Sequence, residues 1–154
     1  MPTNMENSKQ QRQHEQSISV KCRFKGKNLD KKDWFGKSDP YLIISRICDN
    51  GSLEEIHRTP YIRKTLDPAW EPFEMTLVAS GRREVQLKIS CFDWDKNKQD
   101  DLIGEFYTTL SHMMGAKTDT VTWDLINPRK LQNKKNYKNS GYVLLTEIEL
   151  VEES

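Results

Sequence analysis

The chain has 154 residues, of which 35% are hydrophobic and 31% are charged. This size and composition predict one globular domain around one modest hydrophobic core. The 24 Lys and Arg residues nearly cancel the 23 Asp and Glu residues, giving a formal net charge of +1. Overall charge therefore does not indicate a nucleic-acid partner, and only local clusters of charge can point to a function.

The first sixteen residues, MPTNMENSKQQRQHEQ, are polar and show no periodic apolar pattern. We expect a disordered leader over 1–16, a domain over 17–151 and a short tail over 152–154. The start of the chain lacks the apolar stretch of a signal peptide. The three cysteines have no Cys-x-x-Cys spacing, which favours a reduced, cytoplasmic setting. They are Cys22, Cys48 and Cys91.

From Ser17 onward, short runs alternate apolar and polar residues, as half-buried β-strands do, with turn-forming residues between the runs. Eight such strands without long helices predict an all-β fold, an eight-stranded antiparallel β-sandwich. The expected strands cover 17–24, Tyr41–Ile47, Glu55–Arg63, Trp70–Val78, Val85–Phe92, Leu102–Leu110, Thr120–Leu125 and Tyr142–Leu150.

The run over Val85–Phe92 alternates most regularly, so we place it in the middle of a sheet with its apolar side chains inward. The inward residues are Val85, Leu87, Ile89 and Cys91. Pro60 marks an edge strand or a bulge, because proline cannot donate to a ladder.

Two further segments stand outside the strand pattern. LSHMMGAKTD, residues 110–119, predicts about one helical turn with Ser111 as its cap and Gly115 as its end. Residues 127–140, NPRKLQNKKNYKNS, contain five cations and no acid. We expect a basic loop there, which is either solvated or a secondary site for anionic lipid or protein.

Five aspartates in two predicted loops point to a cation site. NLDKKDWFGKSDPYL contains Asp33 and Asp39, and SCFDWDKNKQDDLIGEF contains Asp93, Asp95 and Asp101. If the sandwich brings both loops to one end, these carboxylates repel one another and require a positive partner. Hard oxygen ligands in loops suit Ca²⁺ better than Mg²⁺ or Zn²⁺. Taken singly, each acid is also a common turn residue.

An EF-hand is the rival Ca²⁺ motif, since Asp93, Asp95 and Asn97 match its first, third and fifth positions. Lys98 stands where that motif needs glycine, and Gly104 stands where it needs glutamate. The flanking segments also alternate as strands do. The EF-hand interpretation is therefore excluded.

LDKKDWFGKSDPYL, TLDPAWEPF and FDWDKNKQDDLIGEF, in that order, resemble the C2 domain, the Ca²⁺-dependent phospholipid-binding sandwich of protein kinase C and synaptotagmin. With HRT and DLIGEF, the segment INPRKLQNKKNYKNSGYVLL resembles more narrowly the second C2 domain of copines. Copines carry further domains, so the resemblance implies either an excised domain or a one-domain relative. The strand order implied is the circularly permuted type II form.

The resemblance implies Ca²⁺ ligands at Asp33, Asp39, Asp93, Asp95 and Asp101. Several family members have Ser or Thr at the position of Lys98, where it helps to hold an additional ion, so the lysine is a departure. The implied function is Ca²⁺-dependent recruitment of a cytoplasmic, monomeric domain to anionic phospholipid membranes, the plasma membrane among them.

The resemblance also implies which residues contact lipid. Trp34 matches a residue that inserts into the bilayer, and Phe35 follows it, although either ring could instead fold back on the core. Lys96, Asn97 and Lys98 form a polar loop tip suited to headgroups. A lateral phosphoinositide groove is matched only in part, and a solvated sheet face is the alternative. The residues of the phosphoinositide groove would be Tyr41, Arg58, Arg63 and Lys64.

Three other tryptophans are expected to pack: Trp70 and Trp123 in the core, and Trp94 on a neighbouring loop. The main alternative function is a Ca²⁺-independent protein–protein interaction module of the same fold. Catalysis is not expected, because no Gly-x-Ser-x-Gly or His-Glu-x-x-His motif is present. The three histidines, His14, His57 and His112, also lie in unrelated contexts.

Overall fold

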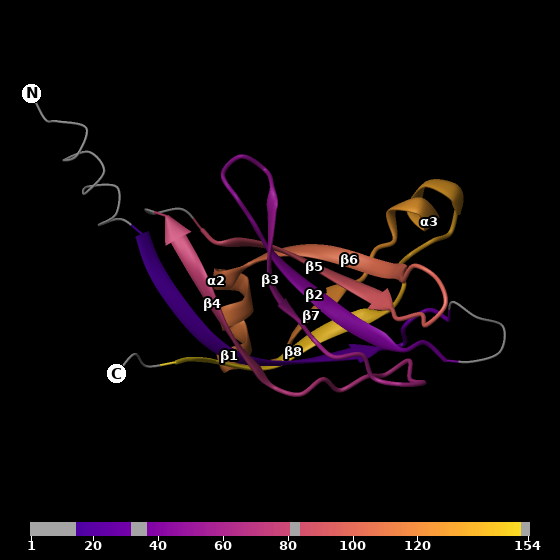
Figure 1. Ribbon diagram of the computed structural model, residues 1–154, viewed down its shortest axis with the longest axis horizontal. Coiled ribbons are helices and arrows are strands. Elements are labelled where there is room, and N and C mark those ends of the chain that lie inside the picture. Colours follow the sequence, from indigo (N-terminus) through magenta and orange to yellow (C-terminus); the bar gives the residue numbers. More distant parts are fainter. Residues whose placement is uncertain (1–14, 32–36, 81–83, 152–154) are drawn as a thin grey trace, which may run out of the picture.

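The computed structural model describes residues 15–31, 37–80 and 84–151, which form two four-stranded sheets packed face to face (Figure 1). One sheet has the order β4-β1-β8-β7 and the other β3-β2-β5-β6, and every neighbouring pair is antiparallel. The predicted eight-stranded antiparallel sandwich is therefore confirmed, and its type II designation stays a prediction. The strands are β1 (Glu15–Lys27), β2 (Pro40–Ile47), β3 (Leu53–Arg58), β4 (Phe73–Ser80), β5 (Gln86–Asp93), β6 (Asp101–Thr109), β7 (Val121–Asp124) and β8 (Tyr142–Leu150).

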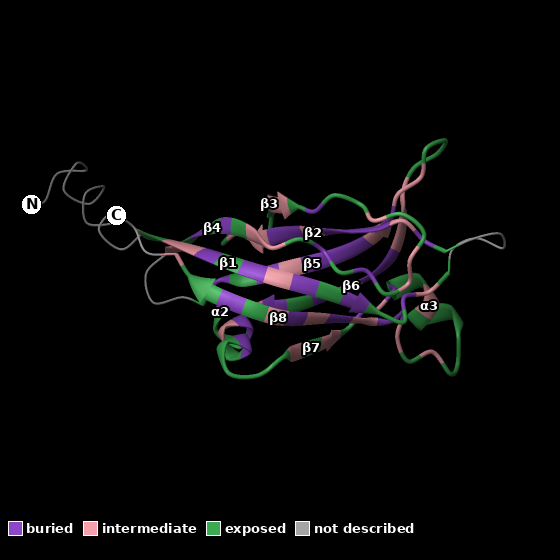
Figure 2. Ribbon diagram, turned by 90° about the horizontal axis from the view of Figure 1, so that it is seen from below, coloured by how far each residue is buried: buried purple, intermediate pink, exposed green. Residues whose placement is uncertain are grey.

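The core lies between the sheets, and the alternation of buried residues with more exposed ones is clearest along β1 and β8 (Figure 2). β5 lies between β2 and β6, and the four predicted inward residues, three in β5 and Val85 just before it, are all buried. Cys22 and Cys91 are buried free thiols, and burial raises the pKa of Cys22 to about 12. Trp70 is also buried, and its indole N–H donates to the Pro40 carbonyl at 3.2 Å.

Two strand ends differ from the predicted ones. β1 pairs with β4 beyond its predicted start, and β3 stops before its predicted end, where Pro60 lacks a backbone donor. β1 starts at Glu15, so it takes in the last two residues of the predicted leader. β3 is an edge strand that ends at Arg58, five residues before the predicted end, since Pro60 has no N–H for the ladder.

The helical turn after β6 is longer than predicted and is capped by a different residue. α2 (Leu110–Met113) has Thr109 as its cap, whose hydroxyl accepts from the His112 amide. The 3₁₀ helix η1 (Met114–Lys117) then runs through Gly115, the predicted end of the turn. Ser111 is not the cap, because its hydroxyl bonds Glu84 instead.

The prediction of a loop over 127–140 was wrong for its first part, which forms the helix α3 (Pro128–Asn133). The Asn127 side chain caps this helix by accepting from two backbone amides, and Pro128 fits the first turn. The chain then returns to β8 through Gly141, whose φ of +113° brings it against Asn28 and Leu29. None of the helices in the described part of the chain is long and apolar enough to span a bilayer.

Candidate metal centre

The links that carry the aspartates meet at one end of the sandwich, on the right in Figure 1, and we call this the acidic end. It comprises the described parts of the β1–β2 link, 28–31 and 37–39, the β5–β6 link, 94–100, and the strand residues Asp93 and Asp101 that flank the second link. Asp33, Trp34 and Phe35 lie outside the described residues. The prediction that both loops meet at one end therefore rests on the other four aspartates.

Asp39 and Asp93 connect the two links directly. The Asp39 amide donates to Asp93 Oδ1 at 2.9 Å, and the Trp94 amide donates to the Asp39 carbonyl at 3.0 Å. Asp93 is only 8% exposed. Asp39 Oδ1 accepts from the Lys64 amide at 2.7 Å, and Lys64 has a positive φ of 52° that turns its N–H toward that carboxylate.

Asp95 and Asp101 lie on either side of the β5–β6 link. Asp95 Oδ1 closes the turn by accepting from the amides of Asn97 and Lys98, at 2.8 and 3.2 Å. Asp101 faces Asp93 across the ladder that joins the two strands. The ammonium of Lys98 lies 4.0 Å from Asp95 Oδ2 and 3.9 Å from Asp101 Oδ2, so a cation of the chain itself stands beside this carboxylate pair.

Asp100 is a residue of this end that the sequence reasoning missed. Its Oδ1 accepts from the Asp95 amide at 2.9 Å, and its Oδ2 accepts from the Tyr41 hydroxyl. The carboxylate thus ties the link to strand β2. Burial, followed by this bond to Asp100, raises the pKa of Tyr41 to about 12. The only sequence signal was the adjacent pair of acids Asp100-Asp101.

The residues predicted to contact headgroups and those of the predicted phosphoinositide groove differ in solvent exposure and in their contacts within the domain. Lys96, Asn97 and Lys98 are exposed at the tip of the β5–β6 link. Tyr41 is 6% exposed, and its ring lies under the Arg58 guanidinium, with 5.8 Å from Cζ to the ring centre. Arg58 also pairs with Glu55 at 2.7 Å. Arg63 and Lys64 are exposed, and the phosphoinositide groove stays a prediction.

Trp94 packs on a neighbouring loop, as predicted. Its ring stacks on that of Tyr61, with centroids 4.2 Å apart and planes 6° apart. Trp123 stacks on Phe106 at 4.9 Å, as a packing tryptophan should. Trp94 lies between Asp93 and Asp95 in the sequence, and its indole ring is held against Tyr61 in a separate link.

Within the described residues, no three His, Cys, Asp or Glu side chains form a group that could hold a metal ion. The carboxylates there are instead engaged by backbone amides and by Lys98. Their chemistry, aspartate oxygens supplied by two links at one end of the fold, does fit a hard cation such as Ca²⁺. The fifth predicted ligand, Asp33, lies outside the described residues.

Comparison with known proteins agrees with this architecture. The structure is similar to that of BON1-C2B, with a TM-score of 0.63 and 24% identity over 88% of this chain and 92% of that one. It is similar to a C2 domain of plant Extended Synaptotagmin 1, with a TM-score of 0.58 and 22% identity over 89% and 97%. Human GIVD cytosolic phospholipase A2 gives a TM-score of 0.60 and 17% identity, over 90% of this chain and 17% of that one.

At these identities the solved structures establish the fold alone. The family itself is established by the sequence, because the family model of the C2 domain matches residues 18–125. This chain belongs to the C2 domain family.

Proposed function

We propose that this domain binds Ca²⁺ at its acidic end and then docks on anionic phospholipid membranes. The observation that carries the proposal is the gathering of Asp39, Asp93, Asp95 and Asp101 at one end of the sandwich. Asp33, from the undescribed part of the same link, would complete the ligand set. The proposal includes the copine-like character indicated by the sequence around NYKNSG.

Bound Ca²⁺ would supply positive charge and open coordination positions for phosphate oxygens. Asp93 is suited to hold the ion because it is almost fully buried and its orientation is fixed by the Asp39 amide. Lys96 and Asn97 are exposed where headgroups would lie. Trp34 and Phe35 would add apolar contact with the bilayer, so the domain would move from the cytoplasm to a membrane when Ca²⁺ rises.

Vesicle sedimentation with and without Ca²⁺ tests this proposal. The parent should sediment with phosphatidylserine vesicles when Ca²⁺ is present and should lose that increment in chelator. Asp93→Asn should lose it too, because Asn keeps an oxygen for the Asp39 amide but removes the charge. Trp34→Ala should weaken vesicle binding by about 1–3 kcal/mol while leaving lipid-free Ca²⁺ binding intact. An unchanged Trp34→Ala variant would show that this ring does not insert.

A second candidate function is a protein–protein interaction module that does not use Ca²⁺. The contacts of Lys98 favour it, because an internal cation and several amides already offset the carboxylates. Tryptophan fluorescence separates the two candidates, since Trp94 lies beside the ligands. A saturable change that chelator reverses supports the Ca²⁺ site, and a flat titration supports the alternative. We propose binding and not catalysis, which an assay for lipid hydrolysis checks.

A further inference from the structure

The segment 127–140, which we call the basic segment, is fixed to the acidic end by contacts on both sides. The Lys130 ammonium pairs with Asp30 at 2.7 Å, at the start of the β1–β2 link. The Asn127 side chain donates to the Leu102 carbonyl at 3.1 Å, next to Asp101. The Asp30 amide donates to the Ser140 carbonyl at 3.1 Å. The segment is therefore held beside the predicted ligands and does not extend away from the domain.

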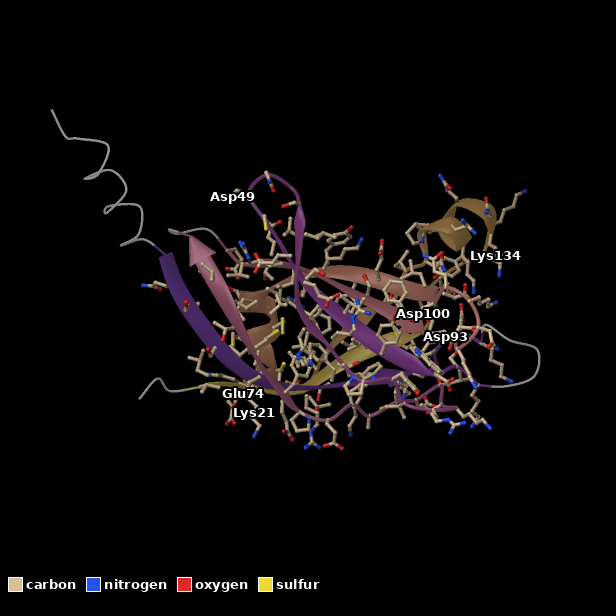
Figure 3. All side chains as sticks on the ribbon, viewed as in Figure 1. Lys21, Asp49, Glu74, Asp93, Asp100 and Lys134 are labelled. Carbon is tan, nitrogen blue, oxygen red and sulfur yellow. The ribbon has the colours of Figure 1, made fainter. Side chains whose placement is uncertain are left out.

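The segment is also braced from within. The Tyr137 hydroxyl accepts from the Asn127 amide at 2.9 Å and bonds the Ser140 hydroxyl, which joins its two ends. Asn127 caps α3 at the same point. A fixed backbone gives its lysines and arginine a defined place on the surface. Figure 3 shows Lys134, which follows α3, at the same end of the molecule as Asp93 and Asp100.

Four of the five cations of this segment are exposed and available. Asp30 offsets the charge of Lys130. Within the residues that the structure describes, the others make no ion pair, and the segment itself contains no acid. They are Arg129, Lys134, Lys135 and Lys138. Leu131 lies among them on α3 and is 57% exposed. The segment thus exposes four cations and one large apolar side chain, which lies between Arg129 and Lys134 in the sequence.

We infer that the basic segment is a second contact for anionic phospholipid, one that acts without Ca²⁺. This inference rests on the proposed function in one respect: docking through the acidic end would turn the adjacent basic segment toward the bilayer. A lipid surface fits these groups because headgroup phosphates and carboxylates attract the cations while the interface accepts the exposed leucine. Each Lys or Arg close to an anionic membrane strengthens binding about fivefold.

The test compares two double variants of the full chain. Lys134→Gln with Lys135→Gln removes two charges from the basic segment. Lys21→Gln with Lys117→Gln removes two charges from exposed lysines outside the basic segment, in β1 and η1, that line one pocket. Thermal unfolding should be unchanged in both, because none of the four side chains makes a hydrogen bond or ion pair within the described residues.

Sedimentation is measured in chelator and in Ca²⁺, with phosphatidylcholine vesicles that contain or lack phosphatidylserine. In chelator the parent should bind only the phosphatidylserine vesicles, more weakly as salt rises. The basic-segment variant should bind about 25-fold more weakly, fivefold for each charge removed, and the control variant should match the parent. The inference is wrong if, in chelator at low salt, the parent binds vesicles with and without phosphatidylserine equally, or if the two variants lose the same amount of vesicle binding.

The same measurements separate this inference from the proposed function. Asp93→Asn should lose only the increment that Ca²⁺ brings and should keep the binding seen in chelator. If Ca²⁺ brings no increment to the parent, the metal proposal fails while the basic segment is still tested in chelator. If an acidic peptide binds the basic segment and phosphatidylserine vesicles do not, the partner is a protein and the lipid assignment is overturned.

Discussion

Lys98 offers the sharpest test of how the acidic end is balanced. Its ammonium lies within about 4 Å of carboxylate oxygens from Asp95 and Asp101, and its side chain is 62% exposed. A Ca²⁺ ion at the same carboxylates would have to displace or repel this ammonium. Lys98→Met removes the charge and keeps most of the side chain's length. The backbone N–H that donates to Asp95 is retained. We expect the variant to bind Ca²⁺ more tightly in the absence of lipid.

The size of the effect follows from the geometry. An exposed ion pair contributes about 0.2–1 kcal/mol, so losing two such contacts frees roughly 0.4–2 kcal/mol for the metal. Repulsion between unit charges about 4 Å apart, on the order of 1 kcal/mol in water, lies in the same range. We expect a gain of about 1–2 kcal/mol, or a Kd lower by about 5- to 30-fold. The gain should shrink as salt is added.

Calorimetric titration of Ca²⁺ measures this change, with Lys96→Met as the matched control. Lys96 is exposed on the same link and makes no ion pair within the described residues. The control loses the same charge from the same link, so it reports the general effect of net charge. An equal gain in both variants, or a weaker Kd for Lys98→Met, would refute the assignment of Lys98 as an internal counter-ion. Binding absent from parent and variants alike would instead count against the Ca²⁺ proposal.

Two further predictions follow from single contacts. Asp100→Ala should cost about 1–3 kcal/mol in the free energy of unfolding, because it leaves the buried Tyr41 hydroxyl and the Asp95 amide without their acceptor. Asp100→Ala should also weaken Ca²⁺ binding, because the Asp95 amide loses its acceptor, whereas Tyr41→Phe should keep that contact and the Ca²⁺ affinity. Equal Ca²⁺ affinities for the two variants would contradict this reasoning. His57 stacks on Phe73 at 3.8 Å, and burial lowers its pKa, although the Glu55 charge opposes the shift. Its contribution to stability is therefore present above about pH 6.5 and lost as pH falls toward the lower folded pKa, and urea unfolding of His57→Gln across that range should lack this loss.

The sequence was sufficient for the sandwich because burial follows period two in its strands. The alternation over Val85, Leu87, Ile89 and Cys91 identified a central strand whose inward residues are all buried. α3 could not be found in this way, since Leu131 is its one large apolar residue and is itself exposed. That helix is held by the Asn127 cap and by the contact of Lys130 with Asp30, a hundred residues away. Asn127-Pro128 was the one local signal that could have indicated its start.

For the candidate site, the residue pattern predicted a cation site on the condition that both acidic loops lie at one end, and the four described aspartates meet that condition. The pattern could not indicate how each carboxylate is engaged, because that depends on contacts between links. Asp39 receives the Lys64 amide, Asp100 joins Asp95 to Tyr41, and Lys98 turns back to the acids. These contacts require the assembled sheets.

The pairing of β1 with β8 has a consequence for how the domain folds during synthesis. Val20 pairs with Leu150 and Lys27 with Tyr142, so a central ladder of one sheet joins segments more than a hundred residues apart. A nascent chain exposes β1 long before β8 exists, and closing so long a loop costs entropy before the ladder forms. Until then the free edge of β1 can pair with other strands, so the late closure of this ladder exposes the nascent chain to aggregation.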